Sequence, residues 1–494
     1  MTFVPQNADD SCLMNQTVPA EGTVASPSEH NEKSQGLNSY LSHNSNDEDT
    51  KRQTRHEPGA DALPPAPPAL VSSSSGSEIS TAGPGLEDQD EFPEGGLQAW
   101  LVVFGSFCSM ISVYGIINSA AVFESYFSTH QLAAYDPSTI GWIFSLYLFI
   151  VFFAGIQVGP VFDRHGPRAL VAVGSLLVVA SQLLLGLCER YYQILLTYSV
   201  LGGLGGALLN VPAYGVIAHF FHRRRGLATG IAATAGSIGG IVFPIYLQAV
   251  LPKLGFAWST RIIGFMLLFL SVLANLLVRT RLPPSTRRVS AMPDWSLFRD
   301  LKFSLCCAGV WFMEWGIFTP LTYIVSYAAA HGQDATSAYT LLAVLNAGSF
   351  FGRSLPGFLA DRFGRFNVIV VTNLLCVVTI LGFWLPAGSS YALIVVFAVT
   401  FGFASGSNLG LYPVCIGQLC DSRDYGRFYS TALMVGSFGT LTSVPIGGAL
   451  LGVGSGEQGW MALILFSALS YVIAMSCFLG ARVLAVSWSV KGVY

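Results

Sequence analysis

The sequence predicts an all-α membrane protein whose twelve transmembrane helices form two six-helix repeats. Three observations lead to this fold class. Hydrophobic residues make up 52% of the 494 residues and charged residues only 11%, whereas soluble domains carry about 25% charged residues. Apolar segments long enough to cross a bilayer recur along the chain. Motifs from the first half of the chain return in the second half.

The N-terminal part differs in composition from everything that follows it. Residues 1–96 contain 16 of the 28 acidic residues but only four of the 25 basic ones. This part is rich in Ser, Pro, Gly and Asn, so it has too little apolar surface to offset the entropy lost on ordering. It also lacks the short apolar core of a secretory signal peptide. We therefore expect residues 1–93 to form a disordered cytoplasmic tail.

Twelve apolar segments follow the tail. A helix needs about 20 apolar residues to cross the hydrocarbon core, and no charged residue lies between Glu94 and Glu124, for example. The predicted spans cover residues 97–121, 139–162, 169–188, 194–218, 226–251, 262–278, 303–327, 338–360, 368–386, 391–417, 428–452 and 460–480.

The positions of lysine and arginine determine the expected orientation, because cytoplasmic loops are enriched in them. With the N-terminus in the cytoplasm, that side carries seventeen Lys and Arg residues and the opposite side carries three. We expect a multi-pass protein of the plasma membrane with both termini in the cytoplasm. The expected domains are an N-terminal six-helix bundle (94–278), a cytoplasmic linker (279–302), a C-terminal six-helix bundle (303–484) and a cytoplasmic C-terminus (485–494).

The two halves share motifs in the same order. The pattern G-x-x-x-D-R-x-G occurs after the second span and after the eighth, 198 residues apart. At an offset of 200 residues, a Gly pair in span four returns in span ten, and a Gly-Ser-x-Gly sequence in span five returns in span eleven. Three coincidences in this order indicate duplication of a six-helix unit. Parallel repeats of this kind place a substrate site between the halves, near the membrane midplane.

The two G-x-x-x-D-R-x-G loops are predicted to control the movement of the halves. Each loop places an aspartate at a helix end beside arginines, where a charge network can lock one arrangement of the helices. Ordinary topology charges would not require the fixed spacing of Gly and Asp. The predicted gating residues are Gly159, Asp163, Arg164, Gly166 and Arg168 in the first loop, and Gly357, Asp361, Arg362, Gly364 and Arg365 in the second.

Only two ionisable residues lie well inside the predicted spans. Glu314 is twelve residues from Lys302 and Arg353 is eight residues from Asp361. A charge at the bilayer centre costs roughly 2.5–3.5 kcal/mol, so a partner or a function must compensate. One hypothesis assigns Arg353 to an anionic or polar substrate and Glu314 to a coupled proton. The other makes them a structural ion pair between spans seven and eight.

Uncharged polar and aromatic residues at the same depth are candidates for the wall of a substrate cavity. Tyr114 and Asn118 join Arg353 and Glu314 as the candidate substrate-binding or coupling residues. Trp311, Trp315 and Tyr323 flank Glu314 and would suit a flat, aromatic substrate. The other polar candidates are Asn210, Tyr214, Asn346 and Asn408.

Other functions find little support in the sequence. The Gly-rich stretch 201–206 lies inside a span, where small residues four apart let helices pack closely, and no GxxxxGK[ST] motif for ATP occurs. The cysteines form no CxxC pair, and His165, His219 and His222 stand apart at loop ends. Neither a metal site nor an enzyme is therefore predicted. We expect no cofactor, with proton coupling left open.

The paired loops resemble those of the major facilitator superfamily. Two further stretches resemble its monocarboxylate-transporter family, and most of all the fungal branch. Glu94-Gly-Gly-Leu-Gln-Ala-Trp100 opens span one, similar to that family's [DE]-G-G-x-x-W sequence. Phe220-Phe-His-Arg-Arg-Arg-Gly-Leu-Ala-Thr-Gly-Ile-Ala232 opens span five, similar to its RRxLAxGxA signature. The resemblance covers residues 94–484 and implies the major facilitator fold and transport without ATP.

The charged groups of that family are only partly present. Animal proton-coupled monocarboxylate transporters have a lysine in span one, where this sequence has Asn118. They also have an Asp–Arg pair one turn apart in span eight. Arg353 matches the arginine, but Ser349 stands where the aspartate would be. Two of the three charged groups of lactate–proton symport are therefore absent.

We expect a secondary active transporter of a small organic molecule that works by alternating access. The substrate would be an organic acid, a vitamin-like compound or a secondary metabolite, with export of a biosynthetic product as one option. The alternatives are proton-coupled monocarboxylate uptake and a nutrient sensor on the same fold. The expected partners are the substrate and the lipid bilayer; neither nucleic acid nor a required protein partner is expected.

Overall fold

The computed structural model describes residues 92–282, 295–453 and 456–486. These residues form helices joined by short loops, with no strand among them. The expected tail up to residue 91, residues 283–294 of the expected linker and residues 487–494 lie outside the described residues.

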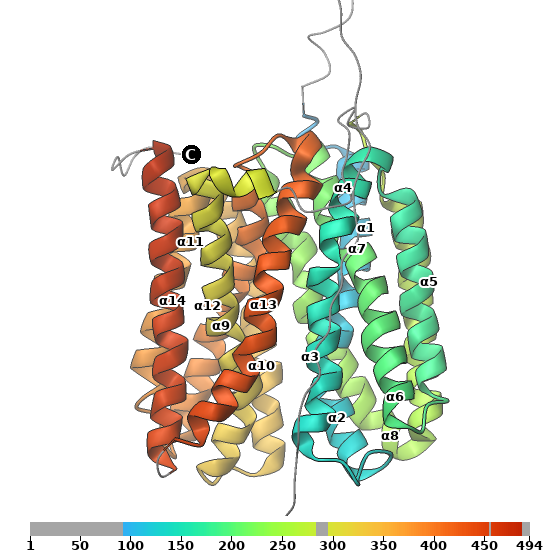
Figure 1. Ribbon diagram of the computed structural model, residues 1–494, viewed down its shortest axis with the longest axis vertical. Coiled ribbons are helices and arrows are strands. Elements are labelled where there is room, and N and C mark those ends of the chain that lie inside the picture. The colour runs from blue at the N-terminus through green and yellow to red at the C-terminus, as the bar shows by residue number, and fades with distance from the viewer. Residues whose placement is uncertain (1–91, 283–294, 454–455, 487–494) are drawn as a thin grey trace, which may run out of the picture. The chain divides into compact units, whose positions relative to one another are not determined.

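Two groups of helices make up the described part (Figure 1). The N-terminal bundle, drawn blue to green, comprises α1 (Leu97–Asn118), α2 (Ala120–Thr129), α3 (Pro137–Phe153), α4 (Gly155–His165), α5 (Arg168–Leu185), α6 (Tyr191–Ile194), η1 (Leu195–Leu201), α7 (Gly202–Phe220) and α8 (Arg225–Leu277). The C-terminal bundle, drawn yellow to red, comprises η2 (Trp295–Arg299), α9 (Leu301–Ala330), α10 (Ala335–Phe363), α11 (Arg365–Thr379), η3 (Ile380–Trp384), α12 (Tyr391–Ile416), η4 (Ser422–Asp424), α13 (Tyr425–Leu451) and α14 (Glu457–Val486).

The described helices account for the twelve expected membrane crossings: ten are long apolar segments, and two more come from α8 and α10. Ten helical segments in the described part are long and apolar enough to span a membrane. One of them, α8, has 53 residues and leaves helical geometry at Gly255 (φ 73°), a conformation that glycine adopts without a steric penalty. Its two arms therefore count as two crossings. The 29 residues of α10 are also long enough, although this more polar helix falls outside the ten. Ten plus one plus one gives twelve, as the sequence predicts.

The internal repeat is visible in how helices end and pack. Gly166 ends α4 with φ 76° and Gly364 ends α10 with φ 92°. Both are the last glycine of the repeated loop, and both have a positive φ, which glycine adopts without a steric penalty. The same residue therefore stops the second and the eighth span.

The repeated Gly-Ser-x-Gly sequences also serve the same purpose in each bundle. In α8, Gly239 lies against the backbone of Gly115 in α1. In α13, Gly439 lies against the Trp311 carbonyl and the Glu314 side chain in α9. Small residues let these helix pairs approach closely, so spans five and eleven pack on spans one and seven in the same way.

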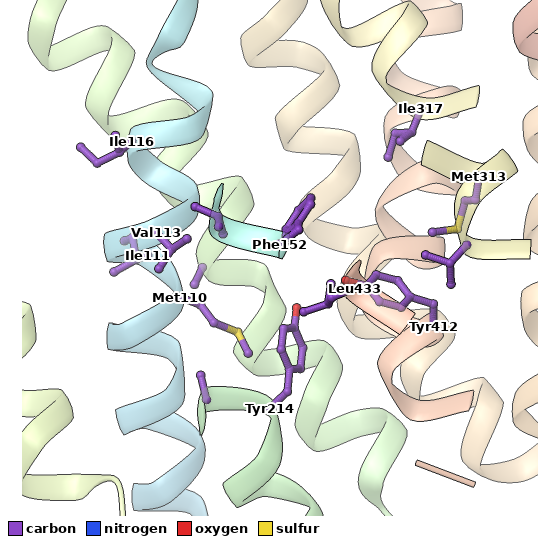
Figure 2. Close-up of a cluster of buried hydrophobic side chains, with 14 of the residues drawn as sticks. Met110, Ile111, Val113, Ile116, Phe152, Tyr214, Met313, Ile317, Tyr412 and Leu433 are labelled. Carbon is purple, nitrogen blue, oxygen red and sulfur yellow. The ribbon is translucent and has the colours of Figure 1, made fainter. Parts of the chain in front are cut away.

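Buried side chains fill the region where the two bundles meet. Figure 2 shows residues of α1, such as Met110, and of α7, such as Tyr214, on one side. Residues of α9, α12 and α13, including Met313 and Tyr412, lie on the other side, with Leu433 between Tyr214 and Tyr412. This buried region positions the candidate substrate residues.

Candidate functional site

Asp163, in the last turn of α4, reaches across to the C-terminal bundle. Its Oδ1 accepts a hydrogen bond from the backbone N–H of Gly426 (2.9 Å), and its Oδ2 accepts one from Arg427 (2.8 Å). These N–H groups belong to the first turn of α13, so they have no partner inside that helix, and the helix dipole favours a negative charge there. The side chain of Asp163 is buried. We call this contact the Asp163 latch.

Asp361, in the last turn of α10, makes the corresponding contact in the opposite direction. Its Oδ1 and Oδ2 accept hydrogen bonds from the backbone N–H groups of Gly226 and Leu227, both at 2.8 Å, in the first turn of α8. We call this contact the Asp361 latch. The sequence motif therefore produces two latches, and each joins the end of one bundle's helix to the start of a helix in the other bundle.

The first glycine of each loop explains how the latches come so close. Gly159 lies against the carbonyl of Gly426, and Gly357 lies against the carbonyl of Gly226. A Cβ atom at either position would overlap that backbone. The spacing between this glycine and the aspartate places both on the same face of the helix, since residues four apart share a face.

The arginines of the loops behave differently from the expectation. Arg164 and Arg168 are exposed, and the expected charge network with Asp163 does not form in the described structure, because backbone N–H groups occupy its carboxylate. Arg362 lies over the ring of Phe358. Arg164 and Arg168 face solvent and Arg362 packs on a ring, so the latches do not fix the positions of these three arginines.

Arg365 is the exception among the loop arginines. Its Nε lies 3.9 Å from the Asp361 carboxylate, and its Nη2 donates to the carbonyl of His222 in the other bundle. Arg365 is buried. The second loop therefore combines a helix cap with a charge pair.

Arg225 is a further residue between the bundles, and the sequence reasoning treated it only as part of a signature. It is 2% exposed. Within its own bundle it donates to the carbonyls of Phe221 (3.1 Å) and Ala218 (3.2 Å). Across the interface it donates to the carbonyl of Gly417 (2.6 Å) and the hydroxyl of Ser422 (2.7 Å). The two latches, Arg225 and Arg365 lie at one end of the bundles, which we call the arginine-rich face.

The two signature stretches of the sequence meet at this face. The Glu94 carboxylate accepts hydrogen bonds from the backbone N–H groups of His222 (2.8 Å), Arg223 (2.5 Å) and Arg224 (3.0 Å). Trp100 also packs against Phe221, with ring centroids 5.2 Å apart. The acidic residue before span one therefore shapes the loop before span five, which gives a physical reason for both signatures to occur in one chain.

Arg353 lies deeper, in the middle of α10, and is 6% exposed. Its Nε donates to the Ser349 hydroxyl one turn away (3.2 Å), and its Nη1 donates to the Ala233 carbonyl of α8 (2.8 Å). The guanidinium group lies directly over Gly236, where any side chain would displace it. Arg353 therefore bridges spans eight and five, a contact between the bundles.

Tyrosines from both bundles surround Arg353. The side chains of Tyr214, Tyr114 and Tyr412 lie near its guanidinium group. The Tyr114 hydroxyl donates to Asn210 Oδ1 (3.1 Å). Tyr214 of α7 and Tyr412 of α12 point toward each other from opposite bundles (Figure 2). Tyr412 escaped the sequence reasoning, although it stands 198 residues after Tyr214, the same offset as the two aspartates.

Asn118 and Asn346 lie next to this group. The Asn118 amide donates to the Tyr114 carbonyl (2.8 Å) and to the Gly236 carbonyl (3.2 Å). Both asparagines lie against Gly240, which has no side chain to separate them. Tyr114, Asn118 and Arg353 are therefore brought together around one stretch of α8.

Glu314 lies apart from Arg353. It is 1% exposed on α9 and packs against Gly436 and Gly439 of α13. The Thr440 hydroxyl donates to its Oε2 (3.4 Å), and Tyr412 and Tyr471 lie near it. No ion pair joins it to Arg353 in the described structure, so the structural-pair hypothesis lacks its contact.

The aromatic residues that flank Glu314 are mostly used in packing. Trp311 stacks on Phe438 of α13, with centroids 6.2 Å apart, and Phe438 also meets Phe149 of α3 at 5.7 Å. The Trp315 indole donates to Thr442 (2.8 Å) and the Tyr323 hydroxyl donates to a carbonyl of α13 (2.8 Å). Trp311 therefore belongs to an aromatic contact between the bundles, whereas Trp315 and Tyr323 tie α9 to α13.

Two repeated helical bundles that meet around buried polar groups and close on each other through latches at one face define an alternating-access membrane transporter. The chain belongs to the Major Facilitator Superfamily, which residues 102–441 match. It is a small-molecule transporter of this superfamily, and its multi-pass membrane character follows from the same match and from its apolar helices.

Curated relatives cover most of the chain. An MFS-type transporter of Penicillium oxalicum is 38% identical over 396 residues, which is 80% of this chain and 93% of the relative. The riboflavin transporter of Saccharomyces cerevisiae is 36% identical and covers 81% of each chain. The aspyridones efflux protein of Emericella nidulans is 34% identical and covers 85% of each chain.

Solved structures share the fold at low sequence identity. The human organic anion transporter MFSD10 aligns with a TM-score of 0.60 at 15% identity, over 77% of this chain and all of the other. The fucose:proton symporter of E. coli aligns with a TM-score of 0.59 at 18% identity, over 77% of this chain and 99% of the other.

Proposed function

We propose that this protein exports a small organic acid or a related secondary metabolite across the plasma membrane, in exchange for protons. The observation that carries the proposal is the pair of latches, which close the arginine-rich face around a buried polar interior. The names of relatives agree with export, since they include efflux proteins for aspyridones and fujikurins. They also include a riboflavin transporter, so a flat heterocycle is a second candidate substrate.

The arginine-rich face is proposed to be cytoplasmic, with both termini on that side. Seventeen Lys and Arg residues on this side against three on the other support the orientation. In this assignment the structure is a state closed toward the cytoplasm. The proposed moving units are the two bundles, residues 94–278 and 303–484, which rock about the interior when the latches open.

Arg353 and Glu314 are proposed to have separate roles. Arg353 has a planar guanidinium group and two neutral hydrogen-bond partners, Ser349 and Ala233, so its charge is left to attract an anionic substrate. Glu314 has no cationic partner in the described structure, and an unpaired buried carboxylate is unfavourable. A proton that binds and leaves as the interior opens would remove that penalty and couple transport to the proton gradient.

Uptake of monocarboxylates by the animal mechanism is less well supported. Asn118 donates both of its described hydrogen bonds to backbone carbonyls, and Ser349 receives one from Arg353. Neither residue can carry the charge that the lysine and aspartate carry in those transporters. The proposed kinship with the fungal branch of the family rests on the contact between its two signature stretches at Glu94.

Plasma-membrane vesicles from yeast that express the protein would test direction and coupling. Riboflavin or a panel of acidic fungal metabolites would be added to the medium around inverted and right-side-out vesicles, and uptake into the vesicles would be followed by mass spectrometry. We expect accumulation in inverted vesicles under a proton gradient and its loss with a protonophore. Accumulation in right-side-out vesicles alone would reverse the direction, and protonophore-insensitive transport would reject proton coupling.

A further inference from the structure

A cavity opens between the bundles at the arginine-rich face, outside the buried interior. Its volume is about 560 Å³, within the range of small-molecule sites. One wall comes from the loop between α7 and α8 and its neighbours, at Phe92, His222, Arg223, Arg225 and Leu282. The other wall comes from the C-terminal bundle, and the residues that form it are Ala360, Asp361, Gly364, Arg365, Gly417, Gln418, Cys420, Asp421, Ser422 and Arg423. Neither the latches nor the proposed substrate residues explain a cavity at this position.

Positive charge dominates the lining of this cavity. Four arginines and two aspartates line it: Arg223, Arg225, Arg365, Arg423, Asp361 and Asp421. Asp361 is already committed to the two N–H groups at the start of α8. The formal balance is therefore four positive charges against two negative ones, with one of the negative charges engaged by a helix start.

Arg225 makes this imbalance unusual. It is nearly fully buried, yet its four hydrogen bonds in the described structure all go to neutral oxygen atoms. Buried charges in proteins are normally paired with an opposite charge. The neighbouring His222 responds to the same field, because partial burial and then the charges of Arg225 and Arg365 lower its pKa. The arginines that line the cavity therefore outnumber the acidic side chains that line it.

We infer that this cavity binds a phosphate group, carried either by a soluble metabolite or by an inositol-lipid headgroup of the cytoplasmic leaflet. Arginine forks match phosphate oxygens with two parallel hydrogen bonds, and the cytoplasmic leaflet attracts basic surfaces through its anionic lipids. Because the walls come from both bundles, a bound phosphate holds them together and favours the closed state. The inference relies on the proposed orientation only for the lipid source.

Thermal unfolding of the purified full-length protein tests the inference without a transport substrate. The probes are inorganic pyrophosphate and short-chain phosphatidylinositol 4-phosphate, with sulfate at equal ionic strength and short-chain phosphatidylcholine as controls. A ligand that binds only the folded state raises Tm in step with ln(1 + c/Kd), where c is the free ligand concentration, and we expect a rise of about 2–4 °C at about 100 times Kd for at least one probe. A rise with pyrophosphate indicates a soluble source, and a rise with the lipid alone indicates a headgroup.

Matched variants locate the effect. Arg423→Gln, at an exposed position of the cavity lining, should abolish the rise in Tm. Arg365→Gln should weaken the apparent affinity for the probe at least tenfold. Arg299→Gln, an exposed arginine of η2 outside the cavity, should leave it unchanged. Arg225→Gln is less suitable as the main test, because its loss also removes the contacts that hold two loops together.

Two results would overturn the inference. One is the absence of any rise, or an equal rise in Arg423→Gln and the unaltered protein. The other is a rise that appears only after the acidic residues Glu87, Asp88, Asp90 and Glu91 are changed to amides, which would mean that the chain's own segment supplies the anion. Vesicle transport can fail while this binding persists, so the two proposals fail separately.

Discussion

The two latches arise from the same repeated motif but differ in what supports them. The Asp163 latch consists of a carboxylate on two backbone N–H groups of α13, and its neighbouring arginines point to solvent. The Asp361 latch has the same two bonds on α8 and, in addition, a buried arginine at 3.9 Å that also contacts the opposite bundle. Position 365 corresponds to Pro167 in the first loop. The comparison shows that the helix cap is the shared element, and that an arginine of the loop itself pairs with the aspartate in the second loop.

The largest effect should come from removing the charge of the Asp163 latch. Asp163→Asn keeps one acceptor but turns an N–H₂ group toward a backbone N–H. Hydrogen bonds to a charged group contribute about 1.5–3 kcal/mol each, so the closed state should weaken by about 3 kcal/mol, roughly a hundredfold. Transport at equal surface abundance should fall accordingly. Asp361→Asn should lose less, because the contacts of Arg365 and Arg225 remain.

Labelling of Cys420 gives a readout that needs no substrate, since this residue lines the cavity at the arginine-rich face. Asp163→Asn should raise its reaction with an impermeant thiol reagent in inverted vesicles, and Cys420→Ser provides the background. Equal labelling and equal transport in Asp163→Asn and Asp361→Asn would show that the two latches do not differ in support.

The close approach of the helices should be equally sensitive on both sides. Gly159→Ala and Gly357→Ala each place a Cβ atom on a backbone carbonyl of the other bundle. Overpacking of this kind costs about 1–3 kcal/mol, so each variant should lose transport roughly thirtyfold if the closed state weakens by about 2 kcal/mol. Gly141→Ala and Gly382→Ala are matched controls, because nothing lies within 4 Å of a Cβ at either position. A normal Gly159→Ala protein would remove this contact from the mechanism.

The inner charges should behave independently of each other. Arg353→Lys keeps the charge but loses the planar fork, and we expect about a tenfold loss of transport, with a larger loss in Arg353→Ala. Glu314→Gln should flatten the pH dependence of transport while substrate exchange survives. Because the two side chains do not meet, the double variant should combine both losses. Recovery of pH-dependent transport in the double variant would instead reveal a structural ion pair.

The smallest effect should come from the support beneath the Asp361 latch. Glu94→Gln leaves the side chain in place but removes the charge that holds three N–H groups before α8. We expect a loss of about 1 kcal/mol and a Tm lowered by about 2–4 °C, measured by thermal unfolding of the purified protein. The effect on Cys420 labelling should be larger in an Asp361→Asn background than in an Asp163→Asn background. The reverse order would place Glu94 on the other latch.

Much of the fold could be predicted from the sequence because a membrane restricts the chain to apolar helices of similar length. Between the predicted spans five and six, α8 stays helical on both sides of Gly255, and only this residue breaks the helix. Repeated residues at a fixed offset identify corresponding positions in the two halves of the chain. The same 198-residue offset links Asn210 to Asn408 and Tyr214 to Tyr412, a signal that would have identified Tyr412.

The partners of the candidate site residues could not be predicted in the same way. Asp163 was expected beside Arg164 and Arg168 because those charges are near in sequence, yet its acceptors are satisfied from 263 and 264 residues away. Every residue except proline has a backbone N–H, so a backbone hydrogen-bond donor cannot be recognised from the residue types in a sequence. The proposed pairing of Glu314 with Arg353 had the same weakness, since similar depth in adjacent spans says nothing about which faces meet.

The sequence by itself determined the all-α membrane class, the two repeats and the positions of the glycines and aspartates that end the second and eighth spans. These features follow from hydropathy, helix length and local backbone conformation, all of which act within one segment. Only the tertiary structure decided that each aspartate caps a helix of the opposite bundle, that Arg353 and Glu314 stay apart, and that Arg225 and Arg365 line a common cavity. These depend on how helices rotate and pack against one another, which is set by contacts between residues hundreds of positions apart.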